Sequence, residues 1–262
     1  MRFSIITVTL NNLEGLIRTI KSVSIQSFRD FQLMVIDGGS VDGSVPWLIE
    51  LANKNKYINV VSGSDEGLYD AMNKGIRLST GEYFIFLNSG DSFFSSDSLE
   101  RIQAAALERE NPHFIFGDTI ELIDGHLFYK KARSQKFVLY GMFAHHQSMV
   151  YSSDIIKKNS LTFNLLYSLA ADWDFTIRFL NLSGNILRLH FPISVFVAGG
   201  ISSNYFLGLQ EQFKIRKSVF KLSSFSCGVF FIFHFLLNFI RSVLPSIYNL
   251  FRFKEFAGQQ NE

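Results

Sequence analysis

Short apolar segments alternate with segments of helical periodicity from the N-terminus to about residue 107. Four of the apolar segments are rich in Ile, Val, Thr and Phe, as buried strands are, and they span 3–9, 31–36, 58–62 and 83–87. Apolar residues at helical spacing follow the first three, starting near Leu13, Val45 and Leu68. This repetition predicts an α/β fold in which helices flank a mostly parallel sheet. Ligands of such sheets bind beyond the carboxyl ends of the strands.

The pattern becomes less regular beyond residue 111. Apolar runs at 113–121 and 126–130 flank the turn residues Asp124 and Gly125, which predicts a hairpin. A strand near 148–151 and a helix near 172–182 follow. The chain has 262 residues, enough for one domain with a packed core and a small appendage.

Charge and cysteine content exclude several classes of protein. The net charge of +2 is too small to indicate a nucleic-acid-binding protein. The single cysteine, Cys227, excludes a disulfide framework within the chain and a zinc site of several thiolates. The N-terminus enters a strand-like run at once and lacks the features of a signal peptide, so we expect the catalytic part to stay in the cytoplasm.

The segment 225–240, FSCGVFFIFHFLLNFI, is strongly apolar. A membrane-spanning helix needs about 20 apolar residues, and this run is shorter and contains His234 and Asn238. Basic residues flank it: Lys214, Arg216, Lys217, Lys221, Arg252 and Lys254. The pattern favours an element that lies in the headgroup region of an anionic membrane. A buried helix of the core or of a dimer interface is the alternative.

We therefore predict a membrane-associating segment at 222–262, with the protein placed peripherally at the cytoplasmic face of the membrane. If the helix belongs to the core or to a dimer, the protein is expected to be cytoplasmic. The ligand pocket is expected to lie wholly upstream of Phe225.

Acidic residues stand at or near the ends of several predicted elements. Asp37 ends the second strand, Asp65 follows the third, Asp91 follows the fourth, and Asp172 opens a later helix. Each one alone fits an ordinary turn or a helix N-terminus. The first three converge on one edge of a parallel sheet, where carboxylates contact a base or ribose, or hold a divalent cation shared with a diphosphate.

Four ordered segments carry a family resemblance: SIITVTLNN, VIDGGSVDGS, SDEGLYDAMNKGIRLSTGEYFIFLNSGD and AADWDFTIRFL. Together they resemble glycosyltransferase family 2, which has the GT-A fold. The match is colinear over about 3–180, with weaker support to residue 217, and it is nearest to bacterial members that build surface polysaccharide. The resemblance implies a catalytic domain at 1–221 that transfers a sugar, with inversion, from a nucleotide-diphosphate sugar, expected to be a UDP-sugar. The acceptor it implies is a lipid-linked glycan.

The resemblance also implies roles for individual residues. The donor site it implies consists of Thr7, Thr9, Asn11, Asp37, Asp65, Lys74, Asn88 and Ser89. Asp91 is implied as the metal ligand, with Mg²⁺ or Mn²⁺ as the cation. Asp172 is implied as the catalytic base.

Two positions depart from the family pattern. Asn88 and Gly90 stand where many relatives have Asp, so Asp91 is the only carboxylate of the metal segment. An Asn carbonyl can ligate a hard cation but brings no charge. Ala171 stands where an acidic residue commonly precedes the base, which puts the acceptor contacts of that neighbour in doubt.

The segment His145-His146-Gln147 is a further polar cluster. Neighbouring histidines of a regular element point in different directions, which disfavours a shared metal. The resemblance places His146 and Gln147 near the donor or the acceptor, and a structural histidine is the alternative. Trp173, beside the base, either stacks on a sugar or fills the core.

Two other functions compete with a glycosyltransferase. A nucleotidyltransferase is disfavoured because Asn11-Asn12-Leu13-Glu14 stands where a glycine-rich phosphate loop with a basic residue would be expected. A homologue that binds nucleotide sugars without activity is supported by Asn88. The sequence contains no Walker A, nucleophile-elbow or Rossmann motif.

Overall fold

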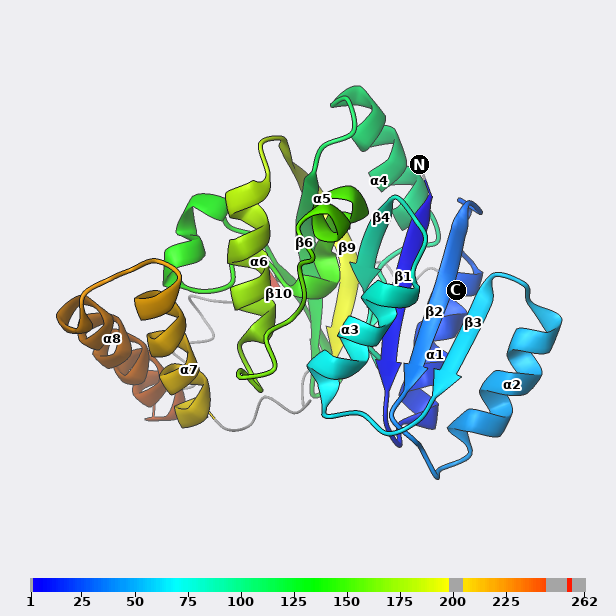
Figure 1. Ribbon diagram of the computed structural model, residues 1–262, viewed down its shortest axis with the longest axis horizontal. Helices are drawn as coiled ribbons and strands as arrows, with labels where there is room; N and C mark the ends of the chain where they lie inside the picture. Colours follow the sequence, from blue (N-terminus) through cyan, green and yellow to red (C-terminus); the bar gives the residue numbers. More distant parts are fainter. Residues whose placement is uncertain (1, 198–204, 244–253, 256–262) are drawn as a thin grey trace.

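A computed structural model describes the chain except for residues 1, 198–204, 244–253 and 256–262 (Figure 1). One mixed sheet forms the centre of the molecule, and its strand order is β10-β7-β6-β8-β4-β1-β2-β3. Alternate residues of β1 belong to different apolar cores: Ile6 and Val8 to one, Phe3 and Ile5 to the other. Two cores separated by a sheet confirm the predicted α/β class.

The first half of the chain forms the parallel part of the sheet. Its strands are β1 (Phe3–Thr9), β2 (Phe31–Asp37), β3 (Ile58–Ser62) and β4 (Tyr83–Phe86). The helices between them are α1 (Leu13–Ser24), α2 (Ser44–Lys54) and α3 (Leu68–Leu78). Every residue of β1, β2 and β4 is buried, which explains why these strands are mostly apolar and do not alternate with exposed polar residues. All four strands lie where the sequence predicts them.

The second half of the chain extends the sheet with mostly antiparallel strands. The strand β8 (Met149–Ser152) lies antiparallel between β4 and β6 (Phe114–Ile123), and β7 (His126–Lys130) completes the predicted hairpin. The short strand β10 (Lys254–Glu255) pairs with β7. The helices of this half are α4 (Ser98–Glu108), η1 (Gln135–Tyr140), η2 (His146–Ser148), α5 (Ser153–Lys158) and α6 (Ala171–Leu182).

One long strand, β9 (Ile186–Val197), has no counterpart in the sequence prediction. It runs parallel to β6 and pairs at its far end with β5 (Ser92–Phe93). Pro192 lies within it, and a proline usually argues against a strand because it lacks a donor. In the structure Pro192 faces Asp118 at an irregularity of the β6–β9 ladder, where that donor is not needed.

Two helices, α7 (Tyr205–Ser218) and α8 (Ser224–Val243), pack on one another at the end of the molecule opposite α2 (Figure 1). The predicted domain boundary at 221/222 falls between them. Among the described helices, none is both long and apolar enough to cross a membrane. Arg216, predicted as a flanking basic residue, is 1% exposed. It donates to the carbonyl oxygens of Leu139 and Tyr140, and Arg252 lies outside the described residues.

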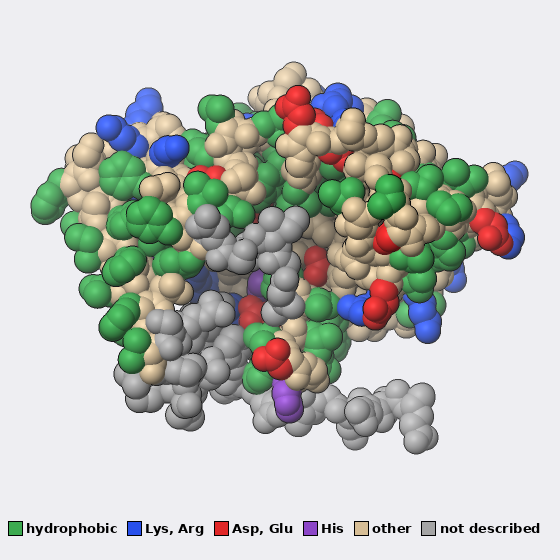
Figure 2. All heavy atoms as spheres, turned by 90° about the horizontal axis from the view of Figure 1, so that it is seen from below, with side chains coloured by type: hydrophobic (Ala, Val, Ile, Leu, Met, Phe, Trp, Pro, Cys, Tyr) green, Lys and Arg blue, Asp and Glu red, His purple; other side chains and the backbone are tan. Residues whose placement is uncertain are grey.

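Much of the surface of α8 is apolar and exposed. Its exposed large side chains are Phe225, Val229, Ile232, Phe233, Phe235, Leu236, Leu237, Phe239, Ile240 and Val243. Figure 2 shows hydrophobic side chains gathered at this end of the molecule, with Lys and Arg side chains beside them. An apolar patch of this kind is unusual on a soluble monomer and marks a surface that contacts something else.

Candidate functional site

A cavity of about 1700 Å³ lies at the carboxyl ends of β1 and β4, where the α/β rule places ligands. Eight of the predicted site residues line it: Thr9, Asp65, Asn88, Ser89, Asp91, His146, Gln147 and Asp172. They come from both halves of the chain. The cavity therefore joins the parallel part of the sheet to α6 and η2.

The end of β1 contributes Thr9, whose Oγ1 is buried and has no partner. Thr7, two residues earlier, is buried away from the cavity and donates from Oγ1 to the Leu87 carbonyl at 2.8 Å. Asn11 has a positive φ of 49° and accepts at Oδ1 from the amide of Val41. Thr7 and Asn11 therefore shape the loops around the cavity, and Thr9 faces it.

Asp37 ends β2 and lies just behind the cavity. Its Oδ1 accepts from the amides of Gly39 and Ser40 and from the Ser62 hydroxyl. Burial opposes the charge, but these hydrogen bonds outweigh it and hold the pKa of Asp37 below its usual value. Its Oδ2 is buried without a partner, and Asp37 itself does not line the cavity.

Asp65 lies on the cavity wall beside Lys74 of α3. The Lys74 ammonium bonds the Asp65 carboxylate and the Ser64 carbonyl, and its nitrogen lies 3.3 Å from Asp70. Lys74 does not line the cavity. Its role in this structure is to hold Asp65 in place.

The turn 88–91 after β4 is built around Thr19 of α1. The Thr19 hydroxyl donates to the Asp91 carbonyl at 2.6 Å and accepts from the amide of Gly90 at 3.0 Å. Gly90 has φ of 107°, a conformation that favours glycine. This backbone leaves the Oδ1 of Asn88 buried with no partner.

Asp91, which the family resemblance implies as the metal ligand, is only 5% exposed. Its Oδ2 accepts from Gln147 Nε2 at 2.7 Å, and its Oδ1 accepts from the amide of Val197 at 3.2 Å. Burial raises the pKa of Asp91 to about 6, although these two hydrogen bonds lower it. Each oxygen of Asp91 already accepts one hydrogen bond and burial disfavours its charge, so this carboxylate would bind a cation less strongly than a free, ionised one.

The described residues contain no group of three His, Cys, Asp or Glu that could hold a metal ion. One oxygen of the turn does fit a hard cation: Asn88 Oδ1, which is buried and unpartnered. A cation here would depend on this neutral carbonyl and on the phosphates of a bound ligand, with Asp91 behind it.

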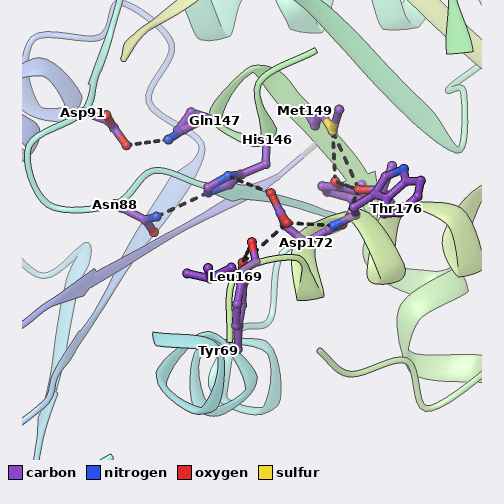
Figure 3. A network of polar contacts seen from close by, with 11 residues as sticks. Tyr69, Asn88, Asp91, His146, Gln147, Met149, Leu169, Asp172 and Thr176 are labelled. Carbon is purple, nitrogen blue, oxygen red and sulfur yellow. Dashed lines mark hydrogen bonds and ion pairs between the residues drawn. The ribbon is translucent and has the colours of Figure 1, made fainter. Parts of the chain in front are cut away.

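Asp172 lies in the first turn of α6 and reaches the cavity. Its Oδ1 accepts from the amide of Trp173 at 2.8 Å and from the Tyr69 hydroxyl at 3.4 Å (Figure 3). Burial raises the pKa of Asp172 to about 6, although these two contacts lower it. A partly desolvated carboxylate with such a pKa suits a general base near neutral pH.

The two histidines of the polar cluster point in different directions, as expected. The His145 Nε2 lies 2.7 Å from Glu121, whereas His146 lies between Asn88 and Asp172 (Figure 3). Trp173 is buried and donates from Nε1 to the Val138 carbonyl, so it fills the core and does not face a sugar.

Sequence reasoning missed three residues that organise the site: Thr19, Tyr69 and Glu211. The Glu211 carboxylate, on α7, accepts from the amides of Ser168, Leu169 and Ala170, which lead into α6. Each acts over a long sequence separation, which no local pattern reveals. Tyr69 alone left a signal, because it lies within the segment that carries the family resemblance.

Comparisons with known proteins agree with this architecture. Residues 4–171 match the family model "Glycosyl transferase family 2". A "PGL/p-HBAD biosynthesis glycosyltransferase" of Mycobacterium tuberculosis is 31% identical over 204 residues, which cover 77% of this chain and 79% of that protein.

Two solved structures have the same mixed α/β fold. S. aureus TarS 1-349 in complex with UDP-GlcNAc superposes with a TM-score of 0.70 at 18% identity, covering 94% of this chain and 76% of that one. The mannosyltransferase PcManGT of Pyrobaculum calidifontis in complex with GDP-Man and Mn²⁺ gives 0.64 at 13% identity, covering 95% and 78%.

Proposed function

Because the chain belongs to glycosyl transferase family 2, we propose that it is an inverting transferase that uses a UDP-sugar and glycosylates a lipid-linked acceptor at a membrane surface. Glycosyl transfer from a nucleotide sugar follows from the family and from the GT-A fold. The donor nucleotide, the inversion, the acceptor and the membrane are what the proposal adds.

The observation that carries the proposal is a set of buried polar atoms without partners around the cavity: Thr9 Oγ1, Asp37 Oδ2, Asn88 Oδ1 and Gln147 Oε1. Buried polar groups in folded proteins are nearly always hydrogen-bonded, so a cluster of unpartnered ones in and behind one cavity wall favours a polar ligand there. Their mixture of a hydroxyl, a carboxylate and amides suits a nucleoside diphosphate with its ribose and base.

Asp172 supplies the base for transfer. Its Oδ1 is held by Trp173 and Tyr69, which leaves Oδ2 to take the proton of an acceptor hydroxyl. A single carboxylate that activates the acceptor favours direct attack on the anomeric carbon, with departure of the nucleoside diphosphate and inversion. The solved structure of S. aureus TarS 1-349, which has a similar fold and contains UDP-GlcNAc, supports a UDP-sugar as the donor.

A divalent cation, Mg²⁺ or Mn²⁺, belongs to the proposal as a group that binds together with the donor. When bound, it would offset the negative charge that develops on the departing diphosphate. Since Asn88 brings no charge and Asp91 is engaged, we expect Mn²⁺ alone to bind weakly and Mn²⁺ with UDP to bind well. Calorimetry with each alone and with both measures this, and Asn88→Asp should tighten Mn²⁺ binding.

The exposed face of α8 supports a peripheral position on the membrane at its cytoplasmic face. Ten large apolar side chains of this helix are exposed, and Lys217 and Lys221 lie next to it in the sequence. Such a surface suits the headgroup region of an anionic bilayer. His234 of α8 lines the cavity, so the pocket does not lie wholly upstream of Phe225 as the sequence suggested. A lipid-anchored acceptor bound at α8 would therefore be close to the base.

An inactive homologue that binds nucleotide sugars is the second candidate, and Asn88 and the engaged Asp91 are the observations that favour it. A nucleotidyltransferase has no such support. Donor hydrolysis, measured as UDP release with and without Mn²⁺, separates the first two, because only an active enzyme releases UDP.

Thermal unfolding with a panel of nucleotides tests the proposal. The panel contains UDP, GDP, UDP-glucose, UDP-GlcNAc and GDP-mannose, each with Mn²⁺ and with EDTA. A ligand at a hundred times its Kd stabilises the fold by about 2.7 kcal/mol, so the correct donor raises Tm by several degrees. Stabilisation by GDP but not by UDP would contradict a UDP-sugar donor. The absence of any shift would contradict a donor site.

A further inference from the structure

We propose that His146 is a positioning residue that connects the donor-binding turn to the proposed base: it accepts a hydrogen bond from Asn88 and, once substrate is bound, donates one to Asp172. The inference rests on the proposed role of Asp172 in transfer. Figure 3 shows the imidazole between the two side chains, with Asn88 on one side and Asp172 on the other. Neither the family match nor the named relatives assign a role to this histidine.

Two contacts define the position of the ring. Asn88 Nδ2 lies 3.3 Å from His146 Nε2, and His146 Nδ1 lies 3.8 Å from Asp172 Oδ2. Each ring nitrogen therefore faces a different functional element, the turn after β4 and the first turn of α6. The side chain of His146 is 16% exposed, so its packing leaves little freedom to turn away.

The two neighbours of the ring agree on one tautomer. With Nδ2 of Asn88 directed at Nε2 and a carboxylate at Nδ1, the arrangement favours the neutral ring in which Nε2 accepts and the proton sits on Nδ1. A neutral ring with a proton on Nδ1 presents an N–H to Asp172 Oδ2.

The Oδ2 atom of Asp172 can accept a hydrogen bond from this N–H group. Trp173 and Tyr69 both donate to Oδ1, and no other donor to Oδ2 is seen among the described residues. At 3.8 Å the contact is longer than a hydrogen bond. Catalytic hydrogen bonds in unliganded enzymes are often long and shorten when the substrate binds. A shortened contact would orient one lone pair of Oδ2 and leave the other for the acceptor hydroxyl.

Through Asn88, a bound nucleotide sugar can act on the contact between His146 and Asp172. Its Oδ1 is buried without a partner, at the place where the diphosphate and its cation are proposed to bind. A positive group at Oδ1 polarises the amide, strengthens the bond from Nδ2 to His146, and makes Nδ1–H a better donor. A bound nucleotide sugar thus lowers the pKa of Asp172, which keeps the proposed base deprotonated.

Several titratable groups surround Asp172, and each must be accounted for in a test. Tyr69 of α3 and His146 of η2 contact its carboxylate. Glu211 of α7 raises its pKa through space, and Tyr151 of β8 has its own pKa raised in part by Asp172. Of these, only His146 also contacts the donor-binding turn.

Two substitutions separate the two contacts of the ring. The amide nitrogen of Asn occupies about the place of Nδ1, so His146→Asn keeps the donor to Asp172 and loses the contact with Asn88. The amide of Gln reaches about the place of Nε2, so His146→Gln keeps the contact with Asn88 and loses the donor to Asp172. His146→Phe removes both contacts at similar size.

The experiment measures the pKa of Asp172 from the pH dependence of its ¹³Cγ resonance in protein labelled at aspartate. The resonance is assigned because it disappears in Asp172→Asn. In His146→Gln and His146→Phe we expect this pKa to rise by about one to two units relative to the parent. In His146→Asn it should stay within about half a unit of the parent. UDP with Mn²⁺ should lower the pKa in the parent and leave it unchanged in His146→Asn.

An equal pKa of Asp172 in the parent and in all three variants overturns the inference, as does a pKa in the parent that UDP with Mn²⁺ does not change. UDP affinity and Tm of each variant show that the fold and the donor site persist. Loss of UDP binding in the parent itself would instead contradict the proposed function, so the two failures are distinguishable.

Discussion

Asp172 and Asp91 are both carboxylates whose pKa is raised to about 6 by burial, and the protein uses them differently. Asp172 keeps Oδ2 directed toward a cavity, with His146 as its neighbour. Both carboxylate oxygens of Asp91 accept hydrogen bonds from the protein, and these bonds connect the turn after β4 to Gln147 and to the end of β9. Their partners, more than their pKa values, distinguish the proposed base from a carboxylate whose two oxygens accept hydrogen bonds from the protein.

The raised pKa of Asp172 sets the expected pH dependence of transfer. A base acts only when deprotonated, so kcat should rise with pH through about 6 and level off above about 7. Measuring kcat for UDP release from pH 4.5 to 8 gives the profile. UDP affinity over the same range is the control, because it separates Asp172 from the titration of Asp91. A kcat that is flat from pH 4.5 to 8 would contradict a base with this pKa.

Substitution of Asp91 should affect the fold before it affects chemistry. Asp91→Ala leaves Gln147 Nε2 and the amide of Val197 without acceptors, which costs about 2 to 4 kcal/mol of unfolding free energy. Asp91→Asn keeps one acceptor and should cost less. Denaturant unfolding of both variants measures this. If Asp91→Ala matches the parent in stability but loses Mn²⁺-dependent UDP binding, then Asp91 is a metal ligand after all.

At the scale of elements, β1 to β4 could be predicted because helices cover both faces of the sheet, so every residue of β1, β2 and β4 is buried and most of them are apolar. The strand β9 could not be predicted, because Pro192 interrupts its apolar sequence pattern where the β6–β9 ladder is irregular. The helix α7 could not be predicted from the sequence for another reason. Its buried face mixes Leu209 and Ile215 with Glu211 and Arg216, which masks the helical period.

The same limits apply to the site. Asp172 and Asn88 could be found because ordered motifs carry them. Thr19 and Glu211 act through contacts 72 and 41 to 43 residues away along the chain, and these depend on the folded arrangement of α1 and α7. The engaged state of Asp91 depends likewise on Val197 at the end of an unpredicted strand.

The exposed face of α8 gives a prediction about the membrane. Ile232→Glu with Leu236→Glu should weaken binding to anionic liposomes, measured by flotation, by about a hundredfold or more, since each buried apolar side chain is worth about 1.5 to 3 kcal/mol. Ile49→Glu, on an exposed position of α2 at the other end of the molecule, is the matched control (Figure 1).

These substitutions are preferable to truncation, because α8 also packs on the core: Phe230 lies 4.8 Å from the Arg216 guanidinium. If the parent protein does not float with the liposomes at low salt, α8 does not bind membranes. The dimer alternative then remains, and sedimentation tests it.

At the scale of the whole molecule, one cavity brings together the two halves of the chain. The parallel half supplies Thr9, Asp65 and the turn after β4, which suit the donor. The other half supplies Asp172 through α6, and α8 reaches the rim through His234. This arrangement leads from the proposed nucleotide site, past the proposed base, to an apolar surface, as the proposed transfer onto a lipid-held acceptor requires.

The most direct test of a nucleotide-sugar transferase with Asp172 as its base compares the parent with Asp172→Asn in two measurements on the same preparations. Calorimetry gives the affinity for UDP with Mn²⁺, and UDP release from the stabilising nucleotide sugar gives turnover. We predict equal UDP affinity and a turnover in Asp172→Asn lower by about a hundred- to ten-thousand-fold. Turnover above about a tenth of the parent rate, well short of that range, would contradict Asp172 as the base.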